Sequence, residues 1–164
     1  LNAIAFGCGP GSFTGVRIAS SVAQGLGFTK KCPTIPISSL AAIAKSAFLE
    51  QQWRSLLVAL DARVGEVYWA QYAIDRDGYA ELIGSEEVCL PEKISVPTSH
   101  HDWYGIGEGW ARYGEILSKK VGAQLQSIHA LQLPKAEAIL LLAKRRLEEG
   151  KYFSSFEAIP VYLR

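Results

Sequence analysis

The chain has 164 residues, of which 49% are hydrophobic and 20% charged, as expected for about one ordinary globular domain with a core of its own. Because 17 Lys and Arg nearly cancel 16 Asp and Glu, the summed charge cannot draw a polyanion to the whole molecule, which argues against strong autonomous binding of nucleic acid. No apolar run is long enough to cross a bilayer, and the three distant cysteines fit neither a disulfide framework nor a C-x-x-C metal clamp. We therefore expect a cytoplasmic protein without a membrane segment.

The first 50 residues predict alternating strands and helices. Apolar runs indicate strands at residues 1–6 and 34–38, and helical spacing indicates helices at residues 12–28 and 39–49. The order is β-α-β-α. The polar residues 50–54 that follow are the expected seam between two subdomains.

The second half predicts the order β-β-β-α-β-α, followed by a last long helix. The expected strands are residues 56–60, 66–74, 80–88 and 103–106, and the expected helices are a short one near Pro91 and longer ones at 110–121 and 135–149. The first half supplies only the last part of such a unit, which indicates a truncated duplication. We therefore predict an α/β fold with mixed sheets.

The glycine-rich segment at residues 7–15 follows the first strand and opens the first helix, where free backbone N–H groups and the helix dipole favour an anion. Its spacing is G-x-G-x-x-x-G and no lysine follows Gly15, so it matches neither a dinucleotide-binding turn nor a P-loop. A nucleophilic Ser12 is disfavoured, because Pro10 and Thr14 stand where a G-x-S-x-G elbow needs glycines. The structural interpretation is that Ser12 or Thr14 caps the helix.

The first helix carries two apolar stripes side by side. The small stripe is Gly15, Ala19, Ala23 and Gly27, the large stripe is Ile18, Val22 and Leu26, and the opposite side holds Arg17, Ser20, Ser21 and Gln24. We expect the large residues to pack on the sheet and the small ones to face another helix. Whether that helix belongs to a partner or to the same chain stays open.

Several blocks of the sequence resemble one family in the same order. Residues 2–5 followed by G-x-G-P-G-S-F-T-G-V-R-I are similar to the signature of the TsaB family, also called YeaZ, in the actin-like and Hsp70-like ATPase superfamily. Similar blocks follow at residues 60–63 with 65–68, at 105–107 and at 160–164, so the resemblance spans the chain. The signature residues assigned on this basis are Gly9, Pro10, Gly11, Ser12, Phe13, Thr14, Gly15, Arg17, Asp61 and Arg63.

The resemblance implies an actin-like, ribonuclease H-like ATPase fold with duplicated mixed-sheet subdomains, the first of them truncated. Residues 1–50 would be the remainder of the N-terminal ribonuclease H-like subdomain, and residues 55–164 the C-terminal one. Because the chain begins at Leu1 and holds no methionine, we expect its natural start to lie upstream.

The resemblance also implies partners. A TsaB subunit would be a non-catalytic scaffold that binds and activates the catalytic subunit TsaD, and with TsaE it would support N6-threonylcarbamoyladenosine modification of tRNA next to the anticodon. We expect no cofactor in this chain, ATP and metal on the partner subunits, tRNA contact only through the complex, and a homodimer in isolation. The partner-binding residues expected on the first helix are Gly15, Val16, Ala19, Ser20, Ala23 and Gly27.

The resemblance predicts that no metal site is present. In TsaD a similar glycine loop leads to an H-x-x-x-H pair that binds metal, and here Ser39 and Ile43 occupy those positions. Isoleucine cannot coordinate a cation. The three histidines offer no substitute, because His100 and His101 are adjacent and His129 stands alone in an expected loop.

Two alternatives remain open. Asp61 at a strand end could hold magnesium as an ATPase carboxylate does, although a turn stabilised by an ion pair between Asp61 and Arg63 is the simpler interpretation. The rival class of function is a metal- or ATP-dependent enzyme, either a peptidase like the M22 glycoproteases or a phosphotransferase.

Overall fold

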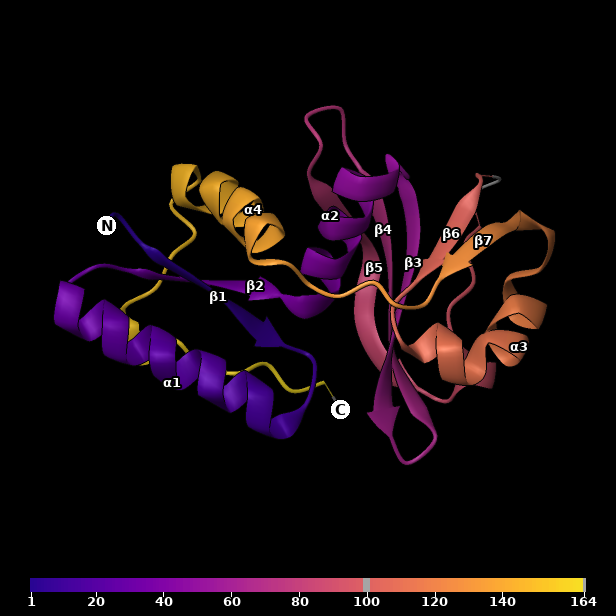
Figure 1. The fold of residues 1–164 in the computed structure, drawn as a ribbon, viewed down its shortest axis with the longest axis horizontal. Helices are drawn as coiled ribbons and strands as arrows, with labels where there is room; N and C mark the ends of the chain where they lie inside the picture. The colour runs from indigo at the N-terminus through magenta and orange to yellow at the C-terminus, as the bar shows by residue number, and fades with distance from the viewer. Residues whose placement is uncertain (99–100, 164) are drawn as a thin grey trace.

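The computed structural model describes residues 1–98 and 101–163, which form two β-sheets with helices between and beside them (Figure 1). Strands β1 (Ile4–Gly9) and β2 (Thr34–Ser38) pair in parallel, and helix α1 (Phe13–Lys30) connects them. These elements match the predicted order of the first 50 residues. Within the described residues, no helix is long and apolar enough to span a bilayer.

Helix α2 (Ser39–Gln51) lies between the two sheets and supplies both of them with core residues (Figure 1). The Ser38 hydroxyl caps it by accepting hydrogen bonds from two backbone N–H groups of the first turn, at 3.1 and 3.3 Å. Ile43 packs against the second sheet, whereas Ala42 packs with Ile37 of β2. A helix that is apolar on nearly every side is expected to be buried in this way.

The second sheet has the strand order β5-β4-β3-β6-β7. Its strands are β3 (Ser55–Arg63), β4 (Glu66–Ile74), β5 (Ala80–Cys89), β6 (Trp103–Ile106) and β7 (Leu125–His129). Strands β3, β4 and β5 pair antiparallel, whereas β6 pairs in parallel with β3 and with β7. The sequence did not predict strand β7. His129 was expected in a loop, but it is the last residue of this strand. The mixed second sheet and the helices around it confirm the predicted α/β fold class, whereas the first sheet is purely parallel.

Each face of the second sheet is covered by a different helix. Helix α3 (Gly109–Val121) packs Trp110 and Leu117 onto Leu57 and Trp69, on the face opposite to α2. The short helix η1 (Pro91–Lys93) lies between β5 and β6, and the short helix η2 (Gly122–Gln124) lies between α3 and β7. The second sheet is therefore sandwiched between two helical layers.

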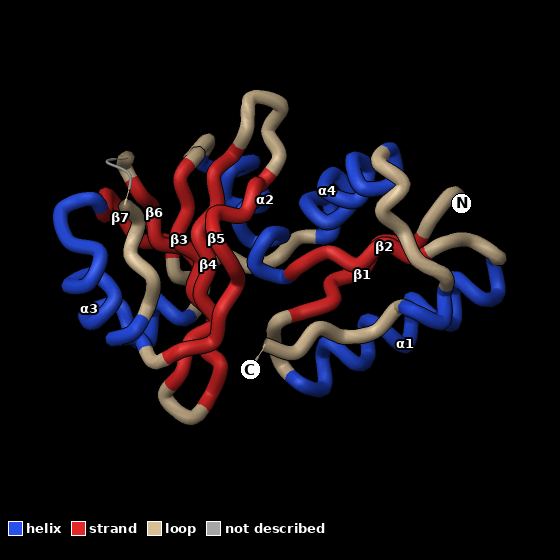
Figure 2. Tube along the Cα trace, turned by 180° about the vertical axis from the view of Figure 1, so that it is seen from behind, coloured by secondary structure: helices blue, strands red, loops and turns tan. Residues whose placement is uncertain are grey.

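The last part of the chain returns to the first sheet (Figure 2). Helix α4 (Ala136–Glu148) packs Leu142 against β2, and the tail after it forms a bridge from Phe153 to Thr34. The backbone N–H of Val161 then donates to the Cys8 carbonyl at 2.8 Å. The predicted assignment of all of residues 55–164 to the second subdomain therefore needs correction, because residues from α4 onward pack on the first.

Candidate functional site

The glycine-rich loop between β1 and α1 is a capped helix start. The Ser12 hydroxyl accepts a hydrogen bond from the backbone N–H of Gly15 at 3.1 Å, and the Ser12 backbone is extended. This confirms the interpretation of Ser12 as a capping residue. Gly9 has φ of 106°, and a Cβ added there would lie 2.8 Å from the Val161 carbonyl oxygen, so the returning tail requires a glycine.

Helix α1 buries the opposite face from the one we expected. Of the six residues predicted to bind a partner, Val16, Ser20, Ala23 and Gly27 are buried within the chain, whereas Gly15 is exposed and Ala19 is half-buried. The physical reason is close approach, because a Cβ added at Gly27 would lie 3.0 Å from the Ser155 Cβ and 3.1 Å from the Thr34 methyl. The predicted packing of the large residues on the sheet is wrong, because Ile18, Val22 and Leu26 are exposed.

The large residues of α1 form its exposed surface. Ile18, Val22 and Leu26 are 59%, 54% and 45% exposed, and we refer to these three residues as the α1 face. The aromatic ring of Phe13 lies at its N-terminal end and lines a shallow hollow together with Ile18 and Val22. A row of half-exposed large apolar side chains on one helix is typical of an interaction surface.

Aromatic side chains from the tail flank both ends of α1. At the N-terminal end the Arg17 guanidinium lies 3.7 Å from the centre of the Phe13 ring, and its Nε donates to the Tyr162 hydroxyl at 3.0 Å. At the C-terminal end the rings of Phe28 and Phe156 meet edge to face, 5.8 Å apart. The tail therefore fixes α1 in place and adds apolar surface to it.

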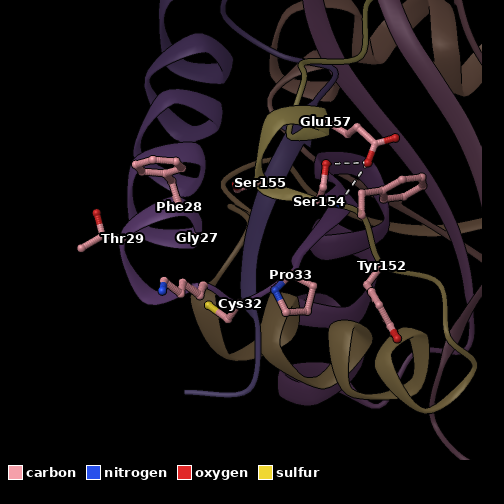
Figure 3. Close-up of a pocket in the computed structure, with 11 residues that line it drawn as sticks. Gly27, Phe28, Thr29, Cys32, Pro33, Tyr152, Ser154, Ser155 and Glu157 are labelled. Carbon is pink, nitrogen blue, oxygen red and sulfur yellow. Dashed lines mark hydrogen bonds between the residues drawn. The ribbon is translucent and has the colours of Figure 1, made fainter.

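A groove of about 840 Å³ lies beside the C-terminal end of α1 (Figure 3). Phe28, Tyr152 and Phe153 contribute aromatic surface to it, and the carboxylate of Glu157 accepts hydrogen bonds from the backbone N–H and hydroxyl of Ser154 at 3.0 and 2.7 Å. These bonds lower the pKa of Glu157, since they favour its charged form. The Glu157 carboxylate thus stabilises the turn of the tail at residues 154–157.

The residues at the position of the metal pair do not fit a cation. Ile43 is fully buried among apolar side chains between α2 and the second sheet, and it has no donor atom. Ser39 is half-buried at the start of α2 and offers a single hydroxyl. Across residues 1–98 and 101–163, no group of three or more His, Cys, Asp or Glu side chains is placed to hold a metal ion.

A partly buried hydrogen-bonded group that the sequence did not reveal links the two sheets beside this position. The Glu86 carboxylate of β5 accepts hydrogen bonds from the Ser38 hydroxyl and from the Tyr72 hydroxyl. Burial and the charge of Glu86 raise the pKa of Tyr72, so its hydroxyl stays protonated as a donor. These residues are 14 to 48 positions apart, and their spacing carries no recognisable signal.

Asp61 is held by α3 and not by the Arg63 side chain. Its Oδ2 pairs with the Arg112 guanidinium at 2.9 Å, and its Oδ1 accepts from the backbone N–H of Arg63 at 3.1 Å. The expected ion pair between Asp61 and Arg63 is therefore replaced by a longer-range pair plus a backbone hydrogen bond. Both carboxylate oxygens therefore accept hydrogen bonds within the chain, near the C-terminal end of the central strand β3.

The remaining candidates for chemistry are not activated. Burial raises the pKa of the Cys8 thiol, and likewise that of Cys89, to about 11, so neither is a thiolate at neutral pH. His129 contacts the Trp53 ring, and His101 is exposed. The predictions for His100 and for the last signature residue, Arg164, lie outside the described residues.

Known proteins resemble this chain over its whole length. The family profile of TsaD, tRNA N6-adenosine threonylcarbamoyltransferase, matches residues 1–164. The tRNA threonylcarbamoyladenosine biosynthesis protein TsaB of Escherichia coli is 40% identical to it over 100% of this chain and 71% of that protein, and TsaB of Haemophilus influenzae is 37% identical over 100% and 70%.

Solved structures agree with the sequence relatives. YeaZ from Pseudomonas aeruginosa superimposes with a TM-score of 0.92 at 42% identity, covering 99% of this chain and 74% of that one. A second structure, described as an uncharacterized protein with similarity to peptidase YEAZ from Pseudomonas aeruginosa, has a TM-score of 0.90 at 41% identity and covers 100% and 74%. The chain therefore belongs to the TsaB family, also called YeaZ.

Proposed function

We propose that this chain acts in the biosynthesis of threonylcarbamoyladenosine in tRNA as a non-catalytic subunit that binds and activates a catalytic TsaD subunit. The names of its TsaB relatives support the pathway, and the match to the TsaD profile supports a link to that enzyme. The observation that carries the scaffold role is the α1 face, three large apolar side chains that the chain itself leaves about half exposed. Binding of TsaE and indirect contact with tRNA complete the proposed complex.

The size of the α1 face fits a helix-packing contact. Full burial of one large aliphatic side chain contributes about 1.5–3 kcal/mol, so burying the exposed half of three would contribute about 2–4 kcal/mol to binding. Gly25 lies among these residues, and a Cβ added there would meet no atom within 4 Å. A surface with both large side chains and a bare backbone position suits a partner helix that approaches closely.

The chemistry of the site supports a non-catalytic role. Ile43 blocks the position of the second metal ligand, and burial raises the pKa of the Cys8 thiol to about 11, so it is not a thiolate at neutral pH. The residue pair at 39 and 43 therefore distinguishes this proposal from the rival metal-dependent enzyme. Metal analysis of the purified protein should find less than stoichiometric zinc or iron, whereas one tightly bound ion per chain would contradict the proposal.

The binding experiment uses Val22→Asp in the full-length protein and measures its affinity for a TsaD subunit by titration calorimetry. We expect at least a hundredfold weaker binding, because a charge would be buried in an apolar contact. Leu131→Asp is the matched control, since Leu131 is also an exposed apolar residue, 85% exposed, but lies in the segment between β7 and α4. Equal affinity of Val22→Asp and wild type would exclude α1 as the contact.

A modification assay tests the activating role. With TsaD, TsaE and tRNA present, threonylcarbamoyladenosine formation should require wild-type protein, and Val22→Asp should reduce it in proportion to lost binding. Ser39→Ala should leave the product yield unchanged, because Ser39 has no catalytic part in the proposal. A strong loss with Ser39→Ala at unchanged affinity would favour the enzyme alternative.

A further inference from the structure

The turn between β3 and β4 holds an apolar residue in a disfavoured backbone conformation. The β3–β4 hairpin projects away from the rest of the chain (Figure 1), and Val64 at its tip is 96% exposed. Val64 has φ of 52° and Arg63 has φ of 67°, a region that β-branched and long side chains rarely adopt. Gly65, with φ of 82°, accepts this conformation easily.

The chain itself gains nothing from a valine at this position. Arg63 and Glu66 pair across the strands, so Val64 and Gly65 are the two central residues of a tight hairpin turn with positive φ. Asn-Gly is the preferred pair in such turns, since asparagine tolerates this conformation. Val64 is almost fully exposed, so no contact within the described residues compensates for the strain.

The base of the hairpin and the α1 face share Phe13 as a neighbour. A pocket of about 280 Å³ is lined by Phe13 and its neighbours in the glycine-rich loop, by residues of the hairpin up to Arg63, and by Glu108 and Tyr162. Phe13 also lines the hollow next to Ile18 and Val22. Phe13 therefore lines both hollows, so a partner that fills both of them contacts Phe13.

The charge of Arg63 indicates what kind of side chain the partner places beside the hairpin. The Arg63 side chain is exposed. Within residues 1–98 and 101–163, the Arg63 guanidinium forms no ion pair. Asp61, the nearest carboxylate in sequence, is taken by Arg112. An incoming surface with an apolar side chain beside a carboxylate would match Val64 and Arg63 together.

We infer that the Val64 tip is a second contact for the TsaD subunit that binds the α1 face, with an apolar side chain of that subunit on Val64 and a carboxylate on Arg63. The inference rests on the proposed function. The strain at residue 64 is kept because the contact in the complex offsets it. The hairpin and α1 then hold the same partner from two different parts of the fold.

The test is Val64→Asn, which converts the turn to Asn-Gly. If Val64 had only a structural role, the stability of the free protein and its affinity for TsaD would change in the same direction. The inference predicts that stability rises while affinity falls. The melting temperature of the free protein should rise by roughly 2–4 °C, and the Kd for TsaD should increase at least about tenfold. Arg63→Gln should weaken binding as well and reduce its dependence on salt concentration.

Wild type and Val22→Asp are measured in the same series. Tight wild-type binding together with an unchanged Kd for Val64→Asn overturns the inference alone. Absence of wild-type binding overturns the proposed function and the inference with it. If Val64→Asn instead reduces self-association in sedimentation while its Kd for TsaD stays the same, the hairpin faces a second copy of the chain and the inference is wrong.

Discussion

Two glycines of α1 test which face of this helix is buried. Gly25→Ala replaces an exposed glycine whose new Cβ meets nothing within 4 Å, so the variant keeps the full gain in helix propensity, about 0.8–1 kcal/mol. Gly27→Ala has the same gain, but its Cβ would lie 3.0 Å from Ser155, 3.1 Å from Thr34 and 3.2 Å from the Cys32 carbonyl oxygen. Overpacking of this kind costs about 1–3 kcal/mol and outweighs the gain.

The assay is thermal unfolding followed by circular dichroism. Gly25→Ala should raise the melting temperature by about 2–4 °C, and Gly27→Ala should leave it unchanged or lower it by a few degrees. Both variants replace glycine by alanine in the same helix. The gain in helix propensity is therefore the same in both, and the difference between their melting temperatures reports on packing alone. If Gly27→Ala were the stabilising change and Gly25→Ala the destabilising one, α1 would be rotated as the small stripe had predicted, and the α1 face would be misassigned.

Three further predictions concern other parts of the fold. Gly105→Ala should destabilise by about 1–3 kcal/mol in urea unfolding, because its Cβ would lie 2.6 Å from the Trp110 ring. Ser12→Ala should cost about 1 kcal/mol through loss of the helix cap. The hydrogen bond from Lys135 lowers the pKa of Glu50 below its usual 4.5, so Glu50→Gln should be less stable than wild type at pH 7, and this difference should vanish as the pH falls through the folded-state pKa. An undiminished difference at acid pH would contradict that assignment.

The sequence predicted most elements because their signals are local. Helix α2 has a serine cap and apolar residues throughout, and β2 and β6 have the predicted bounds. Strand β7 was missed because Leu125–His129 is a short edge strand with mostly exposed side chains and no clear alternation. It pairs with β6 through its backbone, which leaves little trace in composition.

The candidate site depended on contacts that sequence spacing does not record. The periodicity of α1 identified two stripes, but which of them is buried is decided by the tail, where Ala158 is fully buried and its carbonyl accepts from Gln24 at 3.1 Å. The partner of Asp61 is likewise far away, at Arg112. In both cases the arrangement is determined by a contact with a residue more than 50 positions away, which the local sequence pattern does not record.

The return of the tail to the first sheet has a consequence during synthesis on the ribosome. The segment from Ser55 to His129 holds every strand of the second sheet and can form as soon as it leaves the exit tunnel. The cover of the first sheet is completed later, because Thr34 bonds to Phe153, 119 residues further along the chain, and Phe6 is buried together with Ala158. Residues of the first sheet, which precede the second sheet in the chain, are therefore protected after it, and a nascent chain stalled after β7 would present them to chaperones and proteases.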